Sequence, residues 1–373
     1  MVDGDPPNNR RRRFGEVYGF DQLTLEHYCR SMTGLPVSPI SPTISLEEPG
    51  VRHGHLHLPH SRDDSAYGAI MIPISVIAHG DGPTVLLTGG NHGDEYHGPL
   101  ALTKLVNGID AREVTGRIIV VPYMNQPAFT GGARNSPIDG ANLNRVFPGS
   151  PTGGVTEKIA DYLTRYLLPM ADAVLDIHDG GKTLEFLPMA ASHVMENKDH
   201  EARNWEAARA FDAPFATKLV ELDMLGMWDG VVEDSGTPFV STEIAGGGTT
   251  RPSSNSIVDQ GVRNLLKHWG ALTGDPNEST SATLEIPEDD AYLICDDEGL
   301  LDWLVELGDP IVAGQPVARI YNTVKLGTEP IDVNATVTGV LAMRHFPGLV
   351  KMGDAIAMQG LSLIHISEPT RPY

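Results

Sequence analysis

Two histidines and a glutamate stand in short polar segments that each follow an apolar run. His92 and Glu95 lie in GGNHGDE, after the apolar run 84–88, and are three positions apart, so a first helical turn would put both on one face. His178 lies in DIHD, directly after the apolar run 173–177. Two imidazoles and one carboxylate, with a fourth position left for water, are a ligand set of catalytic zinc. The sequence therefore predicts one Zn²⁺ per chain.

Two further polar segments supply groups that hydrolysis would need. Glu243 stands in TEIAGGG after the apolar run 238–242, and a zinc-bound water needs such a carboxylate as its base. Arg134 is followed downstream by Asn144 and Arg145 in ANLNRVFPG. An arginine beside an amide suits a substrate carboxylate, and a second arginine can stabilise the oxyanion of acyl transfer.

The remaining histidines near the N-terminal half are weaker candidates. His53, His55, His57 and His60 form a tract, but the first three alternate as on a solvent-facing strand, so we do not expect them to bind metal. His97 lies close to the proposed ligands, and we expect it to support them rather than join them.

Apolar runs that alternate with helical patterns must position these side chains. Strands are expected at 69–78, 84–88, 117–122, 173–177 and 238–242, with helices beginning near Pro99, at Thr156 and at Ser256. Thr156 and Ser256 are the predicted N-caps. This order predicts an α/β fold with a mixed, largely parallel sheet flanked by helices. Since ligands bind beyond the carboxyl ends of such strands, the four polar segments should converge.

The pattern of residue types along the chain changes near residue 274. A polar linker at 275–284 precedes short strands and turns, which predict a small C-terminal all-β domain of the barrel-sandwich type at 285–360. The expected catalytic domain spans residues 46–274, and a poorly structured lead occupies 1–45. Residues 361–373 have the character of a vector-derived tail and carry no part of the argument.

The composition limits the classes of partner that we expect the protein to bind. The 27 basic and 49 acidic residues give a formal net charge of −22, which repels nucleic acid and anionic membranes. Only two cysteines occur, and no apolar run is long enough for a membrane span, so a reducing cytoplasm is the expected compartment. The expected partner is a small molecule, and homo-oligomerisation stays open.

The polar segments, taken in order, resemble the succinylglutamate desuccinylase/aspartoacylase branch of the zinc carboxypeptidase superfamily. The likeness rests on GGNHGDE, ANLNRVFPG, DIHDGG and TEIAGGG and covers roughly residues 40–360. SPISPTISL, SRDDSAYGAIMIPISVI, LLTGGNHGDEYHGPLAL and RNSPIDGANLNRVFPG are similar to the members that deacetylate N-acetyl-2,4-diaminobutyrate in ectoine breakdown.

This resemblance implies a role for each candidate residue. Those that match the zinc ligands are His92, Glu95 and His178, and Glu243 matches the base. The carboxylate-binding pair is matched by Asn144 and Arg145, and the oxyanion arginine by Arg134.

The implied activity is hydrolysis of the amide of an N-acyl amino acid, with N-α-acetyl-L-2,4-diaminobutyrate as the expected substrate. The alternatives are a succinylglutamate- or N-acylaspartate-type deacylase and a metallocarboxypeptidase, which would use the same ligands. A non-catalytic protein that binds a small molecule is a more distant alternative.

Overall fold

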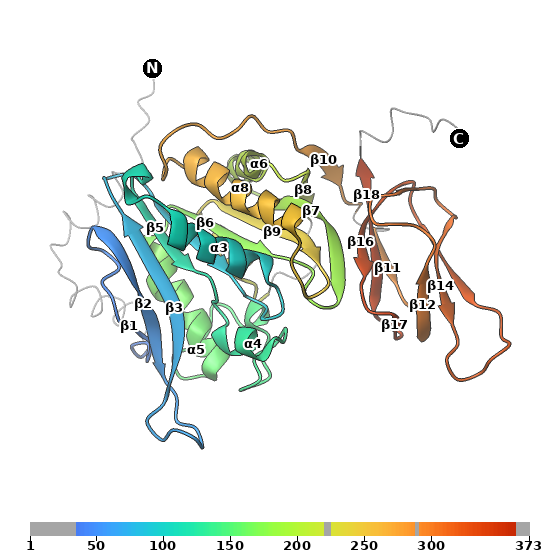
Figure 1. Cartoon of the computed structure of the whole chain (residues 1–373), viewed down its shortest axis with the longest axis horizontal. Helices are drawn as coiled ribbons and strands as arrows, with labels where there is room; N and C mark the ends of the chain where they lie inside the picture. Colours follow the sequence, from blue (N-terminus) through green and yellow to red (C-terminus); the bar gives the residue numbers. More distant parts are fainter. Residues whose placement is uncertain (1–34, 220–224, 288–290, 363–373) are drawn as a thin grey trace.

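The computed structural model describes residues 35–219, 225–287 and 291–362 (Figure 1). Most of the predicted N-terminal lead and the tail beyond residue 362 lie outside these ranges. Of the described end of the lead, Ile40 is buried in the core and β1 (Ser41–Pro42) pairs with β2 (Gly50–Pro59). The domain boundaries expected from the sequence stay a prediction.

Four strands with continuous apolar sequence form the middle of the main sheet. In spatial order they are β5 (Arg117–Val121), β4 (Thr84–Gly89), β6 (Ala173–His178) and β9 (Phe239–Gly246), and each neighbouring pair is parallel. All six residues of β4 are buried, as expected for a strand covered on both faces. The predicted strands at 69–78, 84–88, 117–122 and 173–177 are confirmed within one residue at each end, and the strand predicted at 238–242 extends to Gly246.

Successive residues of these strands point into two separate cores. Leu86 and Ile119 contribute to the core under α5 (Val155–Tyr162) and α7 (Trp228–Asp234). Leu87 and Ile118 contribute to the core under three other helices, which lie over one face of the sheet in Figure 1: α3 (His97–Gly108), α6 (Lys198–Phe211) and α8 (Pro252–His268). The sheet is thus the middle layer of three. Among the described residues, no helix is both long and apolar enough to cross a membrane.

Antiparallel strands extend this parallel centre on both sides and make the sheet mixed. On one side, β3 (Ala69–Ala78) pairs antiparallel with β5 and with β2. On the other, β7 (Leu184–His193) runs antiparallel to β9 and is followed by β8 (Phe215–Leu219) and β10 (Ala282–Glu285). The fold is therefore mixed α/β. The parallel strands form the centre of its sheet, and they lead to the polar segments.

The C-terminal region is all β in the part that the structure describes. One of its sheets has the order β15 (Ile331–Asn334), β14 (Pro316–Tyr321), β12 (Gly299–Trp303), β17 (Leu349–Val350). Facing it are four strands that continue the main sheet: β11 (Tyr292–Ile294), β13 (Pro310–Ile311), β16 (Gly339–His345) and β18 (Ala355–Ser362). A separate apolar cluster that includes Val317, Leu341 and Ile356 fills the space between the sheets.

Two strands join the two regions among the described residues. β10 pairs with β8 on one side and with β18 on the other, and β7 makes the second connection. β7 pairs with β9 along one edge, and its first residues pair with β16 of the β region along the other, with Phe186 opposite Met343. Phe186 and Met189 share an apolar cluster with Val340, Met343 and other side chains of the β region. The β region is therefore packed onto the catalytic sheet and not tethered by the linker alone.

Two predicted helix starts are wrong. α5 begins at Val155 with Gly154 as its N-cap residue, and Thr156 lies one position inside, where its backbone N donates to Asp139 Oδ2 at 2.8 Å. The cap is thus supplied from an upstream loop, which a local pattern does not reveal. α8 begins at Pro252, where the fixed φ of proline favours a first helical position, so Ser256 lies inside the helix and donates to the Pro252 carbonyl at 2.9 Å.

The junction predicts a difference between two methionines of the β region. Met343 is 2 % exposed and packs against the catalytic sheet, whereas Met352 is 74 % exposed. Met343→Ala should lower the free energy of unfolding by roughly 2–5 kcal/mol, because it leaves a cavity at a closed interface. Met352→Ala should change it little. Urea unfolding of both variants checks this, and equal midpoints would contradict the packing described here.

Candidate active site

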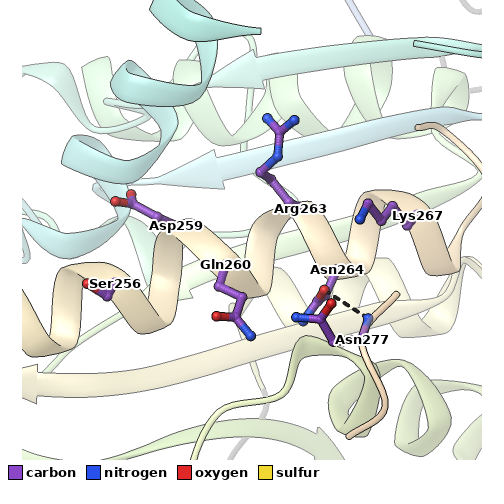
Figure 2. A pocket seen from close by; sticks show the side chains of 7 residues that line it. All are labelled: Ser256, Asp259, Gln260, Arg263, Asn264, Lys267 and Asn277. Carbon is purple, nitrogen blue, oxygen red and sulfur yellow. Dashed lines mark hydrogen bonds between the residues drawn. The ribbon is translucent and has the colours of Figure 1, made fainter. Parts of the chain in front are cut away.

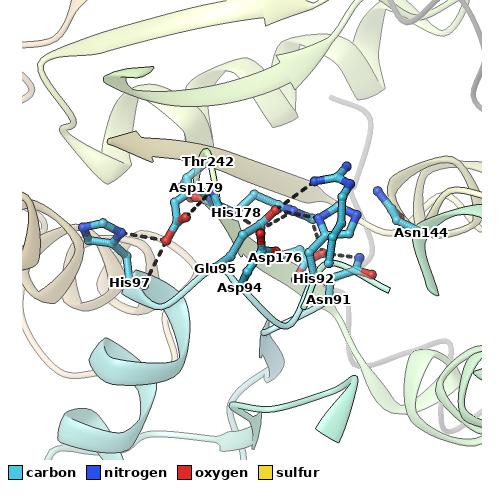
Figure 3. Close-up of polar contacts among 12 residues, drawn as sticks. Asn91, His92, Asp94, Glu95, His97, Asn144, Asp176, His178, Asp179 and Thr242 are labelled. Carbon is cyan, nitrogen blue, oxygen red and sulfur yellow. Dashed lines mark hydrogen bonds and ion pairs between the residues drawn. The ribbon is translucent and has the colours of Figure 1, made fainter. Parts of the chain in front are cut away.

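Three predicted ligands meet where β4 and β6 end. His92, Glu95 and His178 each place one ligand atom within 4.8 Å of the others. The Glu95 carboxylate lies between the two rings, with Oε1 2.6 Å from His92 Nδ1 and Oε2 3.0 Å from His178 Nδ1 (Figure 3). Nitrogen and oxygen donors at this closeness fit a borderline divalent metal such as zinc.

His92 and Glu95 come together in a turn before the helix. The sequence led us to expect the first turn of a helix, but α3 begins only at His97, and Glu95 N donates to the His92 carbonyl at 3.4 Å within a tight turn. Gly93 makes this turn possible, since a Cβ there would lie 2.0 Å from the backbone of Ala128. The turn still directs both side chains to the same point.

Asp176 contacts the His178 ring on the side away from Glu95. The sequence did not lead us to expect this contact. His178 Nε2 lies 2.8 Å from Asp176 Oδ2, on the far side of the ring from Glu95. The Asp176 carboxylate is itself fixed by Thr88 Oγ1 at 2.7 Å and by Asn91 Nδ2 at 3.1 Å. A carboxylate that binds the second nitrogen of a ligating histidine orients the ring and makes it a better donor.

The electrostatics of the three ligands favour a cation. Burial lowers the pKa of His92, which keeps its ring neutral as a metal ligand must be. Burial would also lower the pKa of His178, but the charges of Asp176 and Glu95 outweigh it and raise this pKa well above its usual value. The field at His178 is thus negative and attracts positive charge.

His97 lies beside the ligands and binds Asp179. Its Nδ1 is 2.7 Å from Asp179 Oδ2 and its Nε2 is 3.0 Å from Ser254 Oγ on α8 (Figure 3 shows the Asp179 contact). Asp179 Oδ2 also accepts from the backbone N of Tyr96 and of His97, and its Oδ1 accepts from Gly181 N. This network ties the start of α3 to the end of β6 and leaves Asp179 fully engaged.

All the predicted site residues line one cavity of about 180 Å³. The predicted residues in its wall are His92, Glu95, Arg134, Asn144, Arg145, His178 and Glu243. They come from five separate segments of the chain, and the fold brings them together as the strand-end argument expects. The wall also contains His193 and Asp229, which the sequence analysis did not single out because their segment had no clear periodic pattern.

Glu243 stands directly opposite His178 in the parallel pairing of β6 and β9. Its Oε2 is buried and has no hydrogen-bond partner in the described structure. Burial is the largest cause that raises the pKa of Glu243, to about 8, and the charge of nearby Glu95 adds to it. A carboxylate with a raised pKa can take and return a proton near neutral pH.

The two arginines and the amide occupy different positions in the wall. Arg134 Nη1 lies 3.5 Å from Glu95 Oε1, beside the ligands, and its side chain is about half exposed. Asn144 is buried, and its Oδ1 accepts from Trp228 N at 2.8 Å, which fixes the amide. Arg145 is exposed on the same short 3₁₀ turn, and its Nη1 donates to the Asn144 carbonyl at 2.6 Å. Two fixed cationic groups and an amide therefore face one cavity.

A second hollow lies on the outer face of α8 and does not have this character. It measures about 410 Å³ and is lined by polar side chains of that helix, with Asn277 beyond its end (Figure 2). Its lining contains no histidine and only one carboxylate, that of Asp259, which pairs with Lys104. Size alone does not make it a reaction site, and the predicted site residues all lie in the smaller cavity.

Comparisons with known proteins show the family of the chain. The profile of the succinylglutamate desuccinylase/aspartoacylase catalytic domain matches residues 81–269. The N-α-acetyl-L-2,4-diaminobutyric acid deacetylase of Halomonas elongata is 51 % identical over 324 residues, which are 86 % of this chain and 94 % of that protein.

Solved structures agree as well. The product-bound ectoine utilization protein EutE (DoeB) of Ruegeria pomeroyi is 49 % identical, with a TM-score of 0.86 over 87 % of this chain and all of that one. A succinylglutamate desuccinylase of a Silicibacter species is 50 % identical, with a TM-score of 0.86 over 88 % of this chain and all of that one. The chain belongs to the succinylglutamate desuccinylase/aspartoacylase family.

Proposed function

We propose that this protein is a zinc-dependent deacetylase that hydrolyses N-α-acetyl-L-2,4-diaminobutyrate to L-2,4-diaminobutyrate and acetate, as a step of ectoine degradation. The observation that carries the proposal is the convergence of a histidine–glutamate–histidine set, a half-buried glutamate and two arginines on one small cavity. The similarity to a named deacetylase over most of both chains supports the choice of substrate. The low cysteine count fits a reducing cytoplasm as its compartment.

His92, Glu95 and His178 would hold the zinc, with Asp176 orienting His178. Bound there, zinc would lower the pKa of a water molecule and polarise the acyl carbonyl. The mixed nitrogen and oxygen donors and the negative field at His178 support this ligand set.

Glu243 is the proposed base. It lies opposite His178 across β6 and β9, and its uncompensated Oε2 can accept a proton from the attacking water. The raised pKa makes this carboxylate a stronger base, and the protonated carboxyl can then pass the proton to the departing amine nitrogen, which is more basic. One side chain thus serves as base and acid in turn.

The polar groups on the rest of the wall would hold the substrate. Asn144 and Arg145 suit the free α-carboxylate, because an amide and a guanidinium donate several directed hydrogen bonds to one carboxylate. Arg134 lies next to Glu95 and suits the negative charge that develops on the acyl oxygen. The volume of about 180 Å³ favours a small acyl amino acid over a peptide chain.

The ligand set predicts a specific loss of zinc. Wild-type protein should contain one zinc per chain, and His178→Ala should lose most of it, since two ligands seldom hold a catalytic metal. His55→Ala is the matched control, because His55 is exposed on β2 and far from the ligands in the fold. Elemental analysis of dialysed proteins measures this. Full zinc retention in His178→Ala would remove that residue from the site.

The base assignment predicts that Glu243→Gln keeps its zinc but loses activity by roughly 10²- to 10⁴-fold in kcat. The amide preserves the shape of the side chain and cannot accept the proton of water. Glu298→Gln, at an exposed position of the β region, is the control and should keep wild-type turnover. Turnover of Glu243→Gln within a few-fold of wild type would end the assignment.

Asn144 and Arg145 together form the proposed carboxylate clamp. It predicts the same loss of kcat/KM from a change in the enzyme and from a change in the substrate. Arg145→Ala should lower kcat/KM by roughly 10- to 100-fold, as expected for loss of charged hydrogen bonds, and the methyl ester of the substrate should lower it similarly with wild-type protein. Arg112→Ala, whose side chain is 86 % exposed, should have no effect. If wild-type protein hydrolyses the ester as fast as the acid, the clamp is wrong.

A further inference from the structure

The substrate proposed above carries a second amine, and the cavity must provide a group that accepts its positive charge. Four carboxylates line the cavity wall, namely those of Glu95, Asp179, Asp229 and Glu243. An ammonium inside a cavity of this size loses much of its hydration, so it needs a carboxylate nearby. The geometry of the four decides which one is suited.

Three of these carboxylates already have other contacts or other proposed roles. Glu95 is enclosed by His92 and His178 and belongs to the metal ligands. Glu243 stands opposite His178 and is the proposed base. Asp179 accepts three backbone hydrogen bonds and contacts the His97 ring, so both of its oxygens already serve internal contacts.

Asp229 is different, because its carboxylate lines the cavity and is only loosely held. It is 7 % exposed and lies in the first turn of α7. Its Oδ1 accepts from the neighbouring Gly230 N at 3.3 Å, and its Oδ2 lies 3.6 Å from His193 Nε2, which is longer than a hydrogen bond. Asp229 is thus a buried carboxylate, facing the cavity, with weak partners.

Neighbouring side chains fix the ring of His193, which faces Asp229. His193 Nδ1 lies 3.1 Å from both carboxylate oxygens of Glu233, and Asn204 Nδ2 donates to Glu233 Oε1 at 3.0 Å. The His193 ring is therefore anchored from behind with its other nitrogen turned to Asp229. Even with His193 protonated, Asp229 and Glu233 together leave one negative charge for a ligand.

Asp229 is also tied to the proposed carboxylate clamp. The backbone N of Trp228, the residue before it, donates to Asn144 Oδ1 at 2.8 Å. The start of α7 thus positions the amide of Asn144 and the carboxylate of Asp229 together. An amino acid with a short cationic side chain has both a carboxylate and an ammonium for such a pair to bind.

We propose that Asp229 is the specificity-determining residue that binds the side-chain ammonium of the substrate, with His193 and Glu233 as the residues that position it. This proposal rests on the deacetylase function proposed above and deepens it. It assigns the preference for amine-bearing substrates to one carboxylate on α7. Since burial raises the pKa of Asp229, a bound ammonium would also stabilise its ionised form.

The test compares two substrates that differ only in the charged group. N-α-acetyl-2,4-diaminobutyrate carries the ammonium on the last carbon of its side chain. In N-acetyl-2-aminobutyrate the same carbon is a methyl group. In Asp229→Asn, kcat/KM for the diamino substrate should fall roughly 30-fold or more, mainly through KM, because a buried charge pair is lost. Activity on the neutral substrate should stay within a few-fold, which also shows that the variant folds and binds metal.

Asp234→Asn is the matched control, because Asp234 is on the same helix but exposed. It should leave the ratio of the two kcat/KM values unchanged. An unchanged ratio in Asp229→Asn, or an equal loss on both substrates, would overturn the ammonium site and leave the deacetylase proposal standing. Wild-type protein that releases acetate from neither compound would overturn the proposed function and this proposal with it.

Discussion

The contact of one buried carboxylate with two imidazoles is the interaction around which the site is built. Glu95 is 2 % exposed, and burial alone would raise its pKa, but the charges and hydrogen bonds of His92 and His178 outweigh burial and hold that pKa well below its usual value. A carboxylate kept ionised in the interior needs cationic or metal partners to offset its lost hydration. The strands β4 and β6 must therefore end at the same level, and their register, with Thr88 opposite Asp176, ensures this.

The second structural constraint is the position of β7. Leu184 and Phe186 of this strand line the cavity, while the same residues pair with β16 of the β region. The residues of the cavity wall that the structure describes lie between 92 and 243, so the described part of the β region contributes no side chain to it. Its effect on the cavity is exerted through β7, as a support for one wall. The size of the cavity thus depends on packing between two parts of the chain that are distant in sequence.

The central strands were predictable from the sequence because each is a continuous apolar run, which a sheet covered on both faces requires. The polar segments were predictable as a site because they follow those runs directly. The segment from Leu184 to Asp234 was not predictable in this way. Its strand β7 does not alternate, α6 begins with a run of charged residues, and α7 is short and contains a glycine. Asp229 was missed for this reason.

Roles that depend on contacts between distant parts of the chain also could not be predicted from the sequence. Asp176 is visible in the sequence beside His178, but its function depends on Thr88 and Asn91, which approach it only in the folded sheet. The cap of α5 likewise depends on Asp139. Both oxygens of Asp179 make internal contacts that only the folded structure reveals. Local pattern thus predicted three residues that the fold brings together as a candidate metal site, and tertiary contacts determined the groups around them.

The competition among acyl substrates tests the account most directly. Zinc-loaded protein would be incubated with a mixture of N-α-acetyl-2,4-diaminobutyrate, N-succinylglutamate, N-acetylaspartate and a short peptide, and each product would be followed by mass spectrometry. The proposed metal ligands, base and carboxylate-binding pair in a small cavity predict that acetate release from the diaminobutyrate derivative is fastest. Faster release of the C-terminal residue of the peptide, or faster cleavage of N-succinylglutamate, would contradict it.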